Sequence, residues 1–463
     1  MRKEQIKSVV LVLLILNCVQ LTGQIWFNKK LWPGGYNFFA FNFSSTAMNA
    51  VKPQRLVING GNAREVYYPR QKQYNDIYKN VTNIIANFID SDDLRGTAAV
   101  KDDWKTFLKD KSILLSYGHS MDSGSFTSSF NKAVTGFPYV GVLSDVLITG
   151  DGVTNETIVC IFNSITETAV TYRLEGGGES FLKYIESATF GKNHNKSFAF
   201  ELFWDLNREN TSIERSVLVD SFVLLPMDNE SVNLITAENP LENDFTIFDG
   251  IVSALGYTPS TLRKSVSEND NVASYVENSA TIKISPSGMI EYSAVDPQRG
   301  IPLQTGKADS LNVVNKVFEI TEGIYRQIGI DDIPNIYISS DLIAQKGERF
   351  ILKMNYSHNG KPIFVYSKDN LAPVDAIHAE VEGGYLKSFK MFIRTFNEID
   401  DVATTVPVIT AFDELAKQIG KTRKVLIEDV FKCYIIKDSL AEIAWGVKTD
   451  DVNDNIIIIN FDD

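Results

Sequence analysis

The sequence predicts an α+β protein in which a single N-terminal transmembrane helix precedes three extracytoplasmic domains rich in antiparallel strands. Three observations support this prediction. An uncharged segment near the N-terminus is long enough to span a bilayer. Strand-like runs follow one another without the regular alternation of strands and helices that builds a parallel sheet. Later in the chain, helix-like segments recur, and each ends at an aliphatic residue followed by glycine.

The length and charge of the chain limit what it can do. Its 463 residues are about three times the length of a typical domain, so two to four domains with separate cores are expected. The net charge of −13 argues against a nucleic-acid-binding surface, because such a surface needs a basic face to displace counterions. Three cysteines are too few for a disulfide framework. The fold is therefore expected to depend on packing, and the partners are expected to be proteins.

The first uncharged segment, residues 8–28, lies between Lys7 and Lys29. At about 1.5 Å per residue, it matches the ~30 Å thickness of the hydrocarbon core. Basic residues before it favour a cytoplasmic tail at 1–7, with the bulk of the chain outside a cell membrane that it crosses once. A cleaved signal peptide is the alternative, but Leu21-Thr22-Gly23 is a poor small-x-small cleavage site. An uncleaved anchor is therefore expected.

Three amide side chains share one face of this predicted helix. Asn17, Gln20 and Gln24 follow one another at i, i+3 and i+7. Within the bilayer they have no water to bind, so they favour contact with another transmembrane helix. The alternative is that Gln20 and Gln24 only reach the outer headgroups, which leaves Asn17 as the residue that needs a partner. These three residues are the predicted interface inside the membrane.

The exterior part divides by pattern into a β-rich mixed domain at 41–240, a central α+β domain at 241–345 and a C-terminal α+β domain at 346–463. Apolar residues at helical spacing predict helices in the first domain at Gln71–Ile89 and Asp102–Leu108. Runs of β-branched and aromatic residues predict its strands. These strands are expected at Ser112–Tyr117, Tyr139–Thr149, Thr157–Phe162, Ala169–Leu174, Phe198–Phe203 and Val217–Leu225.

From residue 241 onward, a helix followed by short antiparallel strands occurs three times. Each helix is expected to end at a glycine, because glycine adopts the left-handed conformation that stops a helix. These ends are predicted at Leu255-Gly256, Ile328-Gly329 and Ile419-Gly420. Hairpin turns are predicted at Ser285–Gly288, Asn359-Gly360 and Gly383-Gly384, and a last hairpin joins Ile443–Thr449 to Asn455–Phe461.

One string of residues imitates a catalytic motif. Gly118-His119-Ser120-Met121-Asp122 follows a predicted strand, as the G-x-S-x-G nucleophile elbow does. Asp122, however, replaces the second glycine of a turn that has no room for a side chain, and the surroundings lack an alternating parallel α/β pattern. A polar β-loop is therefore expected here, and no catalytic residue is predicted.

The remaining polar motifs favour structural roles over chemistry. The four histidines, His119, His194, His358 and His378, do not have metal-ligand spacing, so neither a metal nor a cofactor is predicted. The run from His378 to Glu382 alternates along a strand, which indicates a solvent-exposed polar face.

Two loops resemble binding loops without completing their patterns. The acidic segment Asp450–Asn455 lacks the glycine and the distal glutamate of an EF-hand, so an acidic hairpin turn is expected. Gly176-Gly177-Gly178 lacks the lysine that follows in a phosphate-binding loop, so a flexible loop is expected.

The opening of the chain has a distinctive order of residues. Ile6-Lys7-Ser8 precedes the predicted helix, and Ile25 to Phe39 reads IWFNKKLWPGGYNFF. With these features the chain resembles the YycH family of Gram-positive bacteria, and its clostridial members in particular. The two C-terminal units resemble the curved antiparallel sheets with packed helices that this family shares with the companion regulator YycI, which are similar to PepSY-type domains. The family comprises WalH-type regulators of the WalK/WalR (YycG/YycF) two-component system for cell-wall metabolism.

The resemblance implies a signal-transduction protein without enzymatic activity. It would hold down the activity of the WalK sensor histidine kinase, together with a YycI-like partner, through transmembrane and exterior contacts. A tail of seven residues is too short for a signalling domain, which is consistent with such a route. A homodimer remains open. The alternatives are an extracytoplasmic PepSY-type ligand-binding or protease-inhibitor module with the helix as a tether, and, less favoured, a surface hydrolase that uses Ser120.

Overall fold

The computed structural model of the protein describes residues 51–460 except for 62–63, 90–95, 100, 131–136, 138–139, 189–195, 203, 205–215, 227–230, 243–245, 304–308, 345–348, 367–372, 421–422, 438 and 451–455. Contacts divide the chain into one unit at Met1–Phe43 and a second at Ser44–Asp463, and all described residues belong to the second. The predicted anchor at 8–28 lies outside them, so it stays a prediction. Within the described part of the chain, no helix is both long and apolar enough to cross a bilayer.

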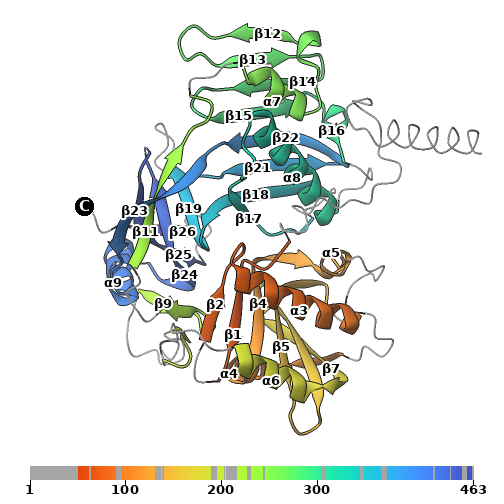
Figure 1. The fold of residues 1–463 in the computed structure, drawn as a ribbon, viewed down its shortest axis with the longest axis vertical. Helices are drawn as coiled ribbons and strands as arrows, with labels where there is room; N and C mark the ends of the chain where they lie inside the picture. The colour runs from red at the N-terminus through yellow and green to blue at the C-terminus, as the bar shows by residue number, and fades with distance from the viewer. Residues whose placement is uncertain are drawn as a thin grey trace, which may run out of the picture. The chain divides into compact units, whose positions relative to one another are not determined.

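The described chain begins with a seven-stranded sheet, the N-terminal sheet, in the order β2-β1-β4-β5-β6-β7-β3 (Figure 1). All neighbouring strands in it are antiparallel. Its strands are β1 (Arg55–Asn59), β2 (Arg64–Tyr67), β3 (Gly96–Ala99), β4 (Ser112–Asp122), β5 (Val142–Gly150), β6 (Glu156–Asn163) and β7 (Thr168–Gly177). The predicted strands at 112–117, 139–149, 157–162 and 169–174 are therefore confirmed within a few residues.

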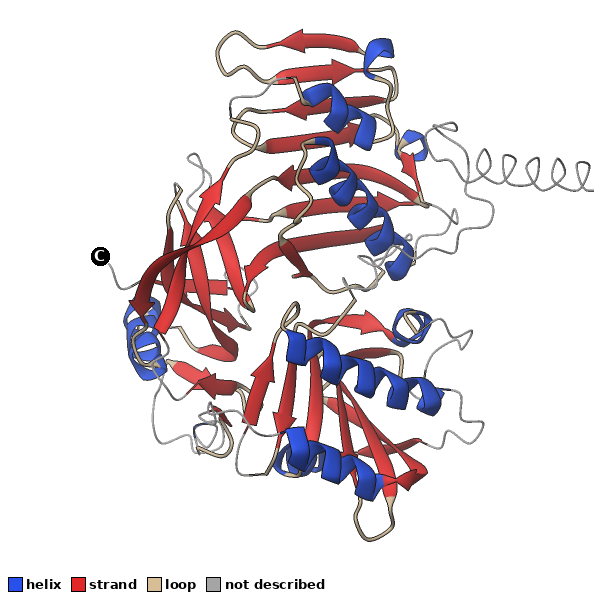
Figure 2. Cartoon of the chain, viewed as in Figure 1, coloured by secondary structure: helices blue, strands red, loops and turns tan. Residues whose placement is uncertain are grey.

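Both faces of the N-terminal sheet are covered. Leu115 of β4 packs in one core cluster with helices α3 (Lys72–Ile89) and α6 (Gly178–Ala188). Its neighbour Leu114 points to the opposite face, where it clusters with Trp104 of helix α4 (Lys101–Lys109) and with the short pair β8 (Lys196–Phe198) and β10 (Leu224–Pro226). Figure 2 shows α3 and α6 along one face of the sheet. Burial on both faces explains why β6 is a nearly continuous apolar run and why most residues of β4 are buried.

Most of the remaining strands form one large sheet, whose main path is β12-β13-β14-β15-β22-β21-β18-β19-β24-β25-β26. Four short strands pair beside this path: β9 (Val217–Val219), β16 (Ile301–Pro302), β17 (Asn335–Ile338) and β20 (Pro373–Val374). The path strands are β12 (Arg263–Val266), β13 (Ala273–Val276), β14 (Ala280–Ile284), β15 (Met289–Ala294), β18 (Arg349–His358), β19 (Lys361–Tyr366), β21 (Ile377–Glu382), β22 (Tyr385–Phe392), β24 (Val425–Ile436), β25 (Ala441–Thr449) and β26 (Ile456–Ile459). The predicted hairpin turns at 285–288, 359–360 and 383–384 connect neighbouring strands of this sheet.

Two parts of the large sheet are each covered by helices. Helices α7 (Phe248–Ala254) and α8 (Ser310–Gln327) pack in the same core cluster as β15, β18, β21 and β22. In Figure 1, α8 lies across β22, β21 and β18, and α7 lies over β14 and β15. Helix α9 (Val408–Ile419) packs against β24, β25 and β26. The glycine stops are confirmed, because Gly256, Gly329 and Gly420 follow these helices with φ of 87°, 76° and 73°.

A two-stranded ribbon of β11 (Ser231–Glu238) and β23 (Thr395–Thr404) lies beside this sheet. The core beneath it joins Ile235 of β11 to Tyr434 of β24, whose hydroxyl donates to the Asn233 carbonyl at 2.8 Å. β18, β21 and β22 follow residue 346 yet lie in the same sheet as β14 and β15, so the boundary expected at 345/346 falls inside a continuous sheet. The division of the exterior into three domains stays a proposal.

Three local predictions differ from the structure. The strand predicted at 198–203 ends at Phe198, and the one at 217–225 is divided into β9 and β10, because Asp220 forms a turn between them by accepting from Phe222 N. Two pairs, β19–β24 and β9–β24, are parallel. Gly176–Gly178 is not a flexible loop: Gly178 begins α6 and is buried, and a Cβ there would lie 2.2 Å from the Glu156 carbonyl oxygen.

Candidate interaction surfaces

The string from Gly118 to Asp122 lies where the N-terminal sheet meets the large sheet. It belongs to the second half of β4, not to a polar loop, and the pairing of β4 with β5 shifts register between Ser116 and Met121. Gly118 has φ of 71°, and a Cβ there would collide with the Gln54 side chain, whose Nε2 donates to the Ile338 carbonyl at 2.7 Å. Gly118 therefore allows close contact with the neighbouring sheet. In this structure it does not serve to expose a nucleophile, as a glycine of a nucleophile elbow would.

Ser120 is fixed by its backbone. Its N–H donates to Asp341 Oδ1 at 2.7 Å, and its carbonyl accepts from Leu342 N at 2.7 Å, while Met121 forms a parallel bridge with Leu342. The residue is 2% exposed. No described hydrogen bond joins it to a histidine. Ser120 thus serves to hold the two sheets together in this structure.

Asp122 connects the starts of two helices. Its Oδ1 accepts from Ser125 N at the N-terminus of helix α5 (Ser123–Ser128), and its Oδ2 accepts from the hydroxyl of Ser310, the first residue of α8, at 2.5 Å. The hydroxyls of Ser125 and Ser310 also share a hydrogen bond. One carboxylate therefore stabilises a helix N-terminus on each side of the junction. We call Gly118–Asp122 with Gln54, Ser310 and 338–342 the β4 junction.

His119 is buried in this junction at 5% exposure. Its ring packs edge-on against Tyr117, and neither nitrogen has a hydrogen-bond partner among the described residues. Burial lowers the pKa of His119 to about 4, and this effect outweighs the attraction of Asp341, while Lys448 of β25 acts in the same direction as burial. The imidazole is therefore neutral at pH 7, and its protonation places a buried charge in the junction on a ring without a hydrogen-bond partner among the described residues.

A second polar cluster links β1 to β24. Arg55 Nη1 lies 3.2 Å from Asp429 Oδ1, and both side chains are about one-quarter exposed. Asp145 of β5 lies close to the same pair, and burial raises its pKa, although hydrogen bonds from Ser144 and Ser116 and the charge of Arg55 oppose the rise. Arg55 is therefore paired with Asp429 and also attracts the charge of Asp145. These residues are distant in sequence, so no motif indicated this cluster.

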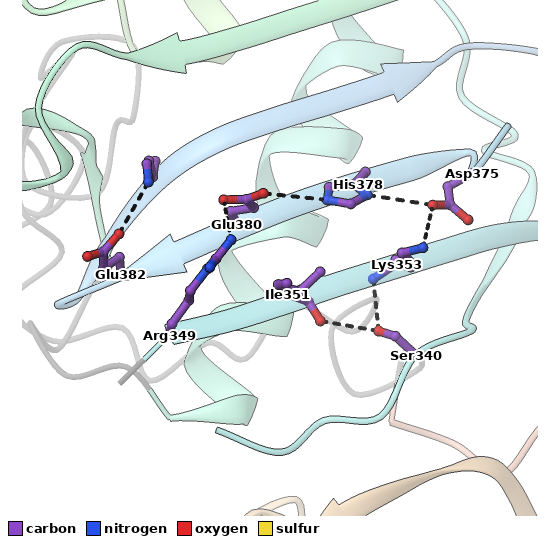
Figure 3. Close-up of polar contacts among 9 residues, drawn as sticks. Ser340, Arg349, Ile351, Lys353, Asp375, His378, Glu380 and Glu382 are labelled. Carbon is purple, nitrogen blue, oxygen red and sulfur yellow. Dashed lines mark hydrogen bonds and ion pairs between the residues drawn. The ribbon is translucent and has the colours of Figure 1, made fainter. Parts of the chain in front are cut away.

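The face of the large sheet opposite α8 is polar (Figure 3). Asp375 Oδ2 lies 3.5 Å from Lys353 Nζ and 3.6 Å from His378 Nδ1, and Glu380 contacts both His378 Nε2 at 3.9 Å and Arg349 Nη2 at 3.2 Å. The alternate residues of β21, among them Ala379 and Val381, are buried under α8. The predicted alternation from His378 to Glu382 is thus confirmed. The carboxylates and cations of this polar face are already paired with one another.

His358 lies at the tip of the β18–β19 hairpin, beside a cavity of about 580 Å³. Its Nε2 lies 2.7 Å from Glu398 Oε1, and Asn359 Nδ2 donates to the same oxygen at 2.6 Å. These contacts lower the pKa of Glu398, mainly through the hydrogen bond with His358. Arg70 also lines the cavity and donates to the Ile333 carbonyl. His358, Glu398 and Asn359 thus form a hydrogen-bonded cluster beside this cavity.

Several sequence predictions fall on residues that the structure does not describe. These are the amide face at Asn17, Gln20 and Gln24, the histidine His194, and most of the acidic turn, residues 451–455. Among the described residues, no group of three or more histidine, cysteine, aspartate or glutamate side chains could hold a metal ion.

The chain is similar to a known protein in its fold. No protein-family model matches the chain, and no curated protein matches it either. Among solved structures, YycH from Bacillus subtilis aligns with a TM-score of 0.58 and 12% identity, over 90% of this chain and 97% of that one. An uncharacterized protein from Eubacterium rectale aligns over 53% of this chain and 86% of its own, with 11% identity and a TM-score of 0.35, which is too low to support an argument. The predicted resemblance is therefore confirmed in three dimensions: this chain has the YycH fold.

Proposed function

We propose that this protein is a membrane-anchored extracytoplasmic regulator of a WalK-type sensor histidine kinase. It would hold kinase activity down together with a YycI-like partner, and so act on cell-wall metabolism. The observation that supports this proposal most is the likeness to YycH, which extends over nearly the whole length of both chains. Fold alone does not fix function, so the proposal also depends on the anchor that the sequence predicts.

The proposed route passes through the membrane and through exterior contacts. Only residues 1–7 are expected in the cytoplasm, so an effect on an internal kinase domain has to pass through helix packing or through surfaces outside. Asn17, Gln20 and Gln24 are the proposed contact inside the bilayer. Each amide there would gain a hydrogen-bond partner that lipid cannot provide.

The test is a complementation series in a strain that lacks the gene, with a reporter of kinase output. Deletion is expected to raise the output, and the wild-type chain to lower it again. The triple variant Asn17→Ala, Gln20→Ala, Gln24→Ala is expected to lose most of this repression. The matched control is Leu11→Ala, Ile15→Ala, Thr22→Ala, which changes the opposite face of the predicted helix and should repress normally.

A swap of residues 8–28 for an unrelated transmembrane helix separates the two routes. Unchanged repression by the swapped chain, at equal abundance in the membrane fraction, would mean that the exterior acts alone and the helix is only a tether. Output that does not respond to the gene at all would contradict the proposed function. A cysteine at position 17 that crosslinks to a kinase helix would support it directly.

A further inference from the structure

The cavity beside His358 is formed by segments that are far apart in the sequence. Its volume of about 580 Å³ lies in the range of roughly 300 to 1,000 Å³ that is usual for ligand-binding cavities. It is lined by the loop between β2 and α3, the end of β11, the loop before β17, the β18–β19 hairpin and the start of β23. We call it the hairpin cavity, and its lining includes Arg70, Glu238, Asn335, Asn359 and Asn397.

Two of the lining segments have a constrained backbone. Arg70 has φ of 75° and Asn359 has φ of 48°, and they are two of the five residues other than glycine with positive φ in the described part of the chain. Such an angle is uncommon for arginine and persists where the surrounding structure fixes it. Next to Asn359, Gly360 packs so closely on Tyr68 that a Cβ would collide with the ring. The hairpin tip is thus held against the loop that contains Arg70.

The charges in and beside the hairpin cavity are mostly negative. Arg70 is the only lysine or arginine of the lining, and its Nη1 already lies 3.5 Å from Asp332 Oδ1. A second carboxylate of the lining, Glu238, has no cation within ion-pair distance among the described residues. Glu398 adds a third carboxylate beside His358. These charges sum to a negative value whether His358 is protonated or neutral.

The amide groups of the lining use their donors and leave acceptors. Asn335 Nδ2 donates to Ser357 Oγ, and Asn359 Nδ2 donates to Glu398 Oε1, both at 2.6 Å. The Oδ1 atoms of these two asparagines have no hydrogen-bond partner in the described part of the chain, and the same holds for the whole amide of Asn397. Together with the Glu238 carboxylate, the hairpin cavity therefore offers more acceptors than donors.

A positively charged group that is rich in N–H donors fits such a lining. A guanidinium presents five donors in one plane and no acceptor, whereas an ammonium is a compact charge with three donors. Beyond the cavity, β23 continues to Asp400 and Asp401, which are exposed and lie where its pairing with β11 shifts register. Three residues of an extended chain span about 10 Å. A polypeptide with basic residues at i and i+3 can therefore reach both places, which a free amine cannot.

We propose that the hairpin cavity binds an arginine side chain from an extended segment of another protein. The guanidinium would pair with Glu238 and donate to the amide oxygens of Asn335 and Asn397. A second basic residue, three positions further on, would lie near Asp400 and Asp401. This inference goes beyond the proposed function and does not depend on it, because it concerns an exterior contact whichever kinase the protein regulates.

The proposal is tested with the full-length protein in detergent micelles and synthetic peptides. The probe is fluorescein-GSTRTSRTSG-amide. One control peptide has citrulline in place of both arginines, which keeps the shape and removes the charge, and another has lysine in place of both. By fluorescence anisotropy, the arginine peptide is expected to bind at least tenfold more tightly than the citrulline peptide and severalfold more tightly than the lysine peptide. Its binding should weaken as salt rises.

Three variants locate the site, and all three change exposed residues, so the fold should be retained. Glu238→Gln removes the carboxylate that has no described cation partner and should weaken binding at least fivefold. Asn397→Arg places a guanidinium of the chain itself at the cavity and should abolish binding. The matched control is Glu175→Gln on β7 of the N-terminal sheet, where a carboxylate also has no described cation partner. This variant should bind as the wild type does.

Three results would overturn the proposal. The first is equal binding of the arginine and citrulline peptides. The second is an equal loss in Glu238→Gln and Glu175→Gln, because the peptide would then respond only to the net charge of −13. The third is binding of argininamide as tightly as the peptide, which would make the occupant a small molecule and not a protein segment. None of these results bears on the complementation test of the proposed function.

Discussion

The β4 junction and the polar face contain similar side chains in different surroundings. Each has a histidine near carboxylates: His119 near Asp341 in the junction, and His378 between Asp375 and Glu380 on the polar face. The first imidazole is buried and its pKa falls to about 4, whereas the second is about one-third exposed and in contact with both carboxylates. The two histidines differ in burial and not in residue type. We therefore expect the stability of the fold to depend on the surroundings of His119 more than on those of His378.

The largest effect is expected at Asp122. Asp122→Ala removes the N-cap of α5 and the acceptor of the Ser310 hydroxyl, so the free energy of unfolding should fall by about 3 kcal/mol. The matched control is Asp309→Ala, because Asp309 caps α8 from an exposed position and should cost only about 1 kcal/mol. Urea unfolding followed by tryptophan fluorescence measures both. Equal losses would mean that Asp122 acts as an ordinary helix cap and not as a link between the sheets.

Acid is expected to weaken the junction through His119. Its pKa is lower in the folded state than in the unfolded state, so the unfolded chain takes up a proton first as the pH falls from about 6.5 to about 4. Stability is therefore lost over this window, by about 3 kcal/mol if His119 acts alone. His119→Phe keeps a ring beside Tyr117 and should remove this part of the pH dependence. Thermal unfolding at pH 7 and pH 5 tests the prediction, which fails if the two proteins lose stability in parallel.

Asp145 is expected to change the stability of the fold with pH in the opposite direction to His119. Its pKa is higher in the folded state than in the unfolded state, so its contribution favours the fold at low pH and is lost as the pH rises through the raised value. Asp145→Asn should therefore be at least as stable as the wild type at pH 7, and its relative advantage should shrink in acid. The same pH series measures it. A marked loss of stability at pH 7 would show instead that the carboxylate is needed to hold Arg55.

The smallest effect is expected on the polar face. Glu380→Gln removes contacts with Arg349 and His378, but these groups are one-quarter to two-fifths exposed, so the cost should stay below about 1 kcal/mol. The difference from the wild type should shrink further in 0.5 M salt. A loss as large as that of Asp122→Ala would remove the distinction between the two regions.

Much of the secondary structure was predictable because its signals are local. The three glycine stops depend on one backbone conformation each, and the alternation from His378 to Glu382 depends on the two-residue period of a strand. The prediction of a flexible loop at Gly176–Gly178 was wrong because the local signal there is ambiguous. Glycine suits both a flexible loop and a tightly packed helix start, and only the position of the Glu156 carbonyl decides between them.

By itself, the sequence determined the β-rich α+β class, the helix ends and the hairpin turns, because periodicity and turn chemistry act between residues near in the chain. The resemblance to the YycH family rested instead on the order of residues from Ile6 to Phe39. The tertiary structure decided which strands share a sheet, and it brought Arg55, Asp145 and Asp429 together from three separate strands. It also turned the apparent catalytic string at Ser120 into a contact between two sheets. Desolvation and pairing across long sequence separations set these features, and neither can be evaluated before the neighbours of each residue are known.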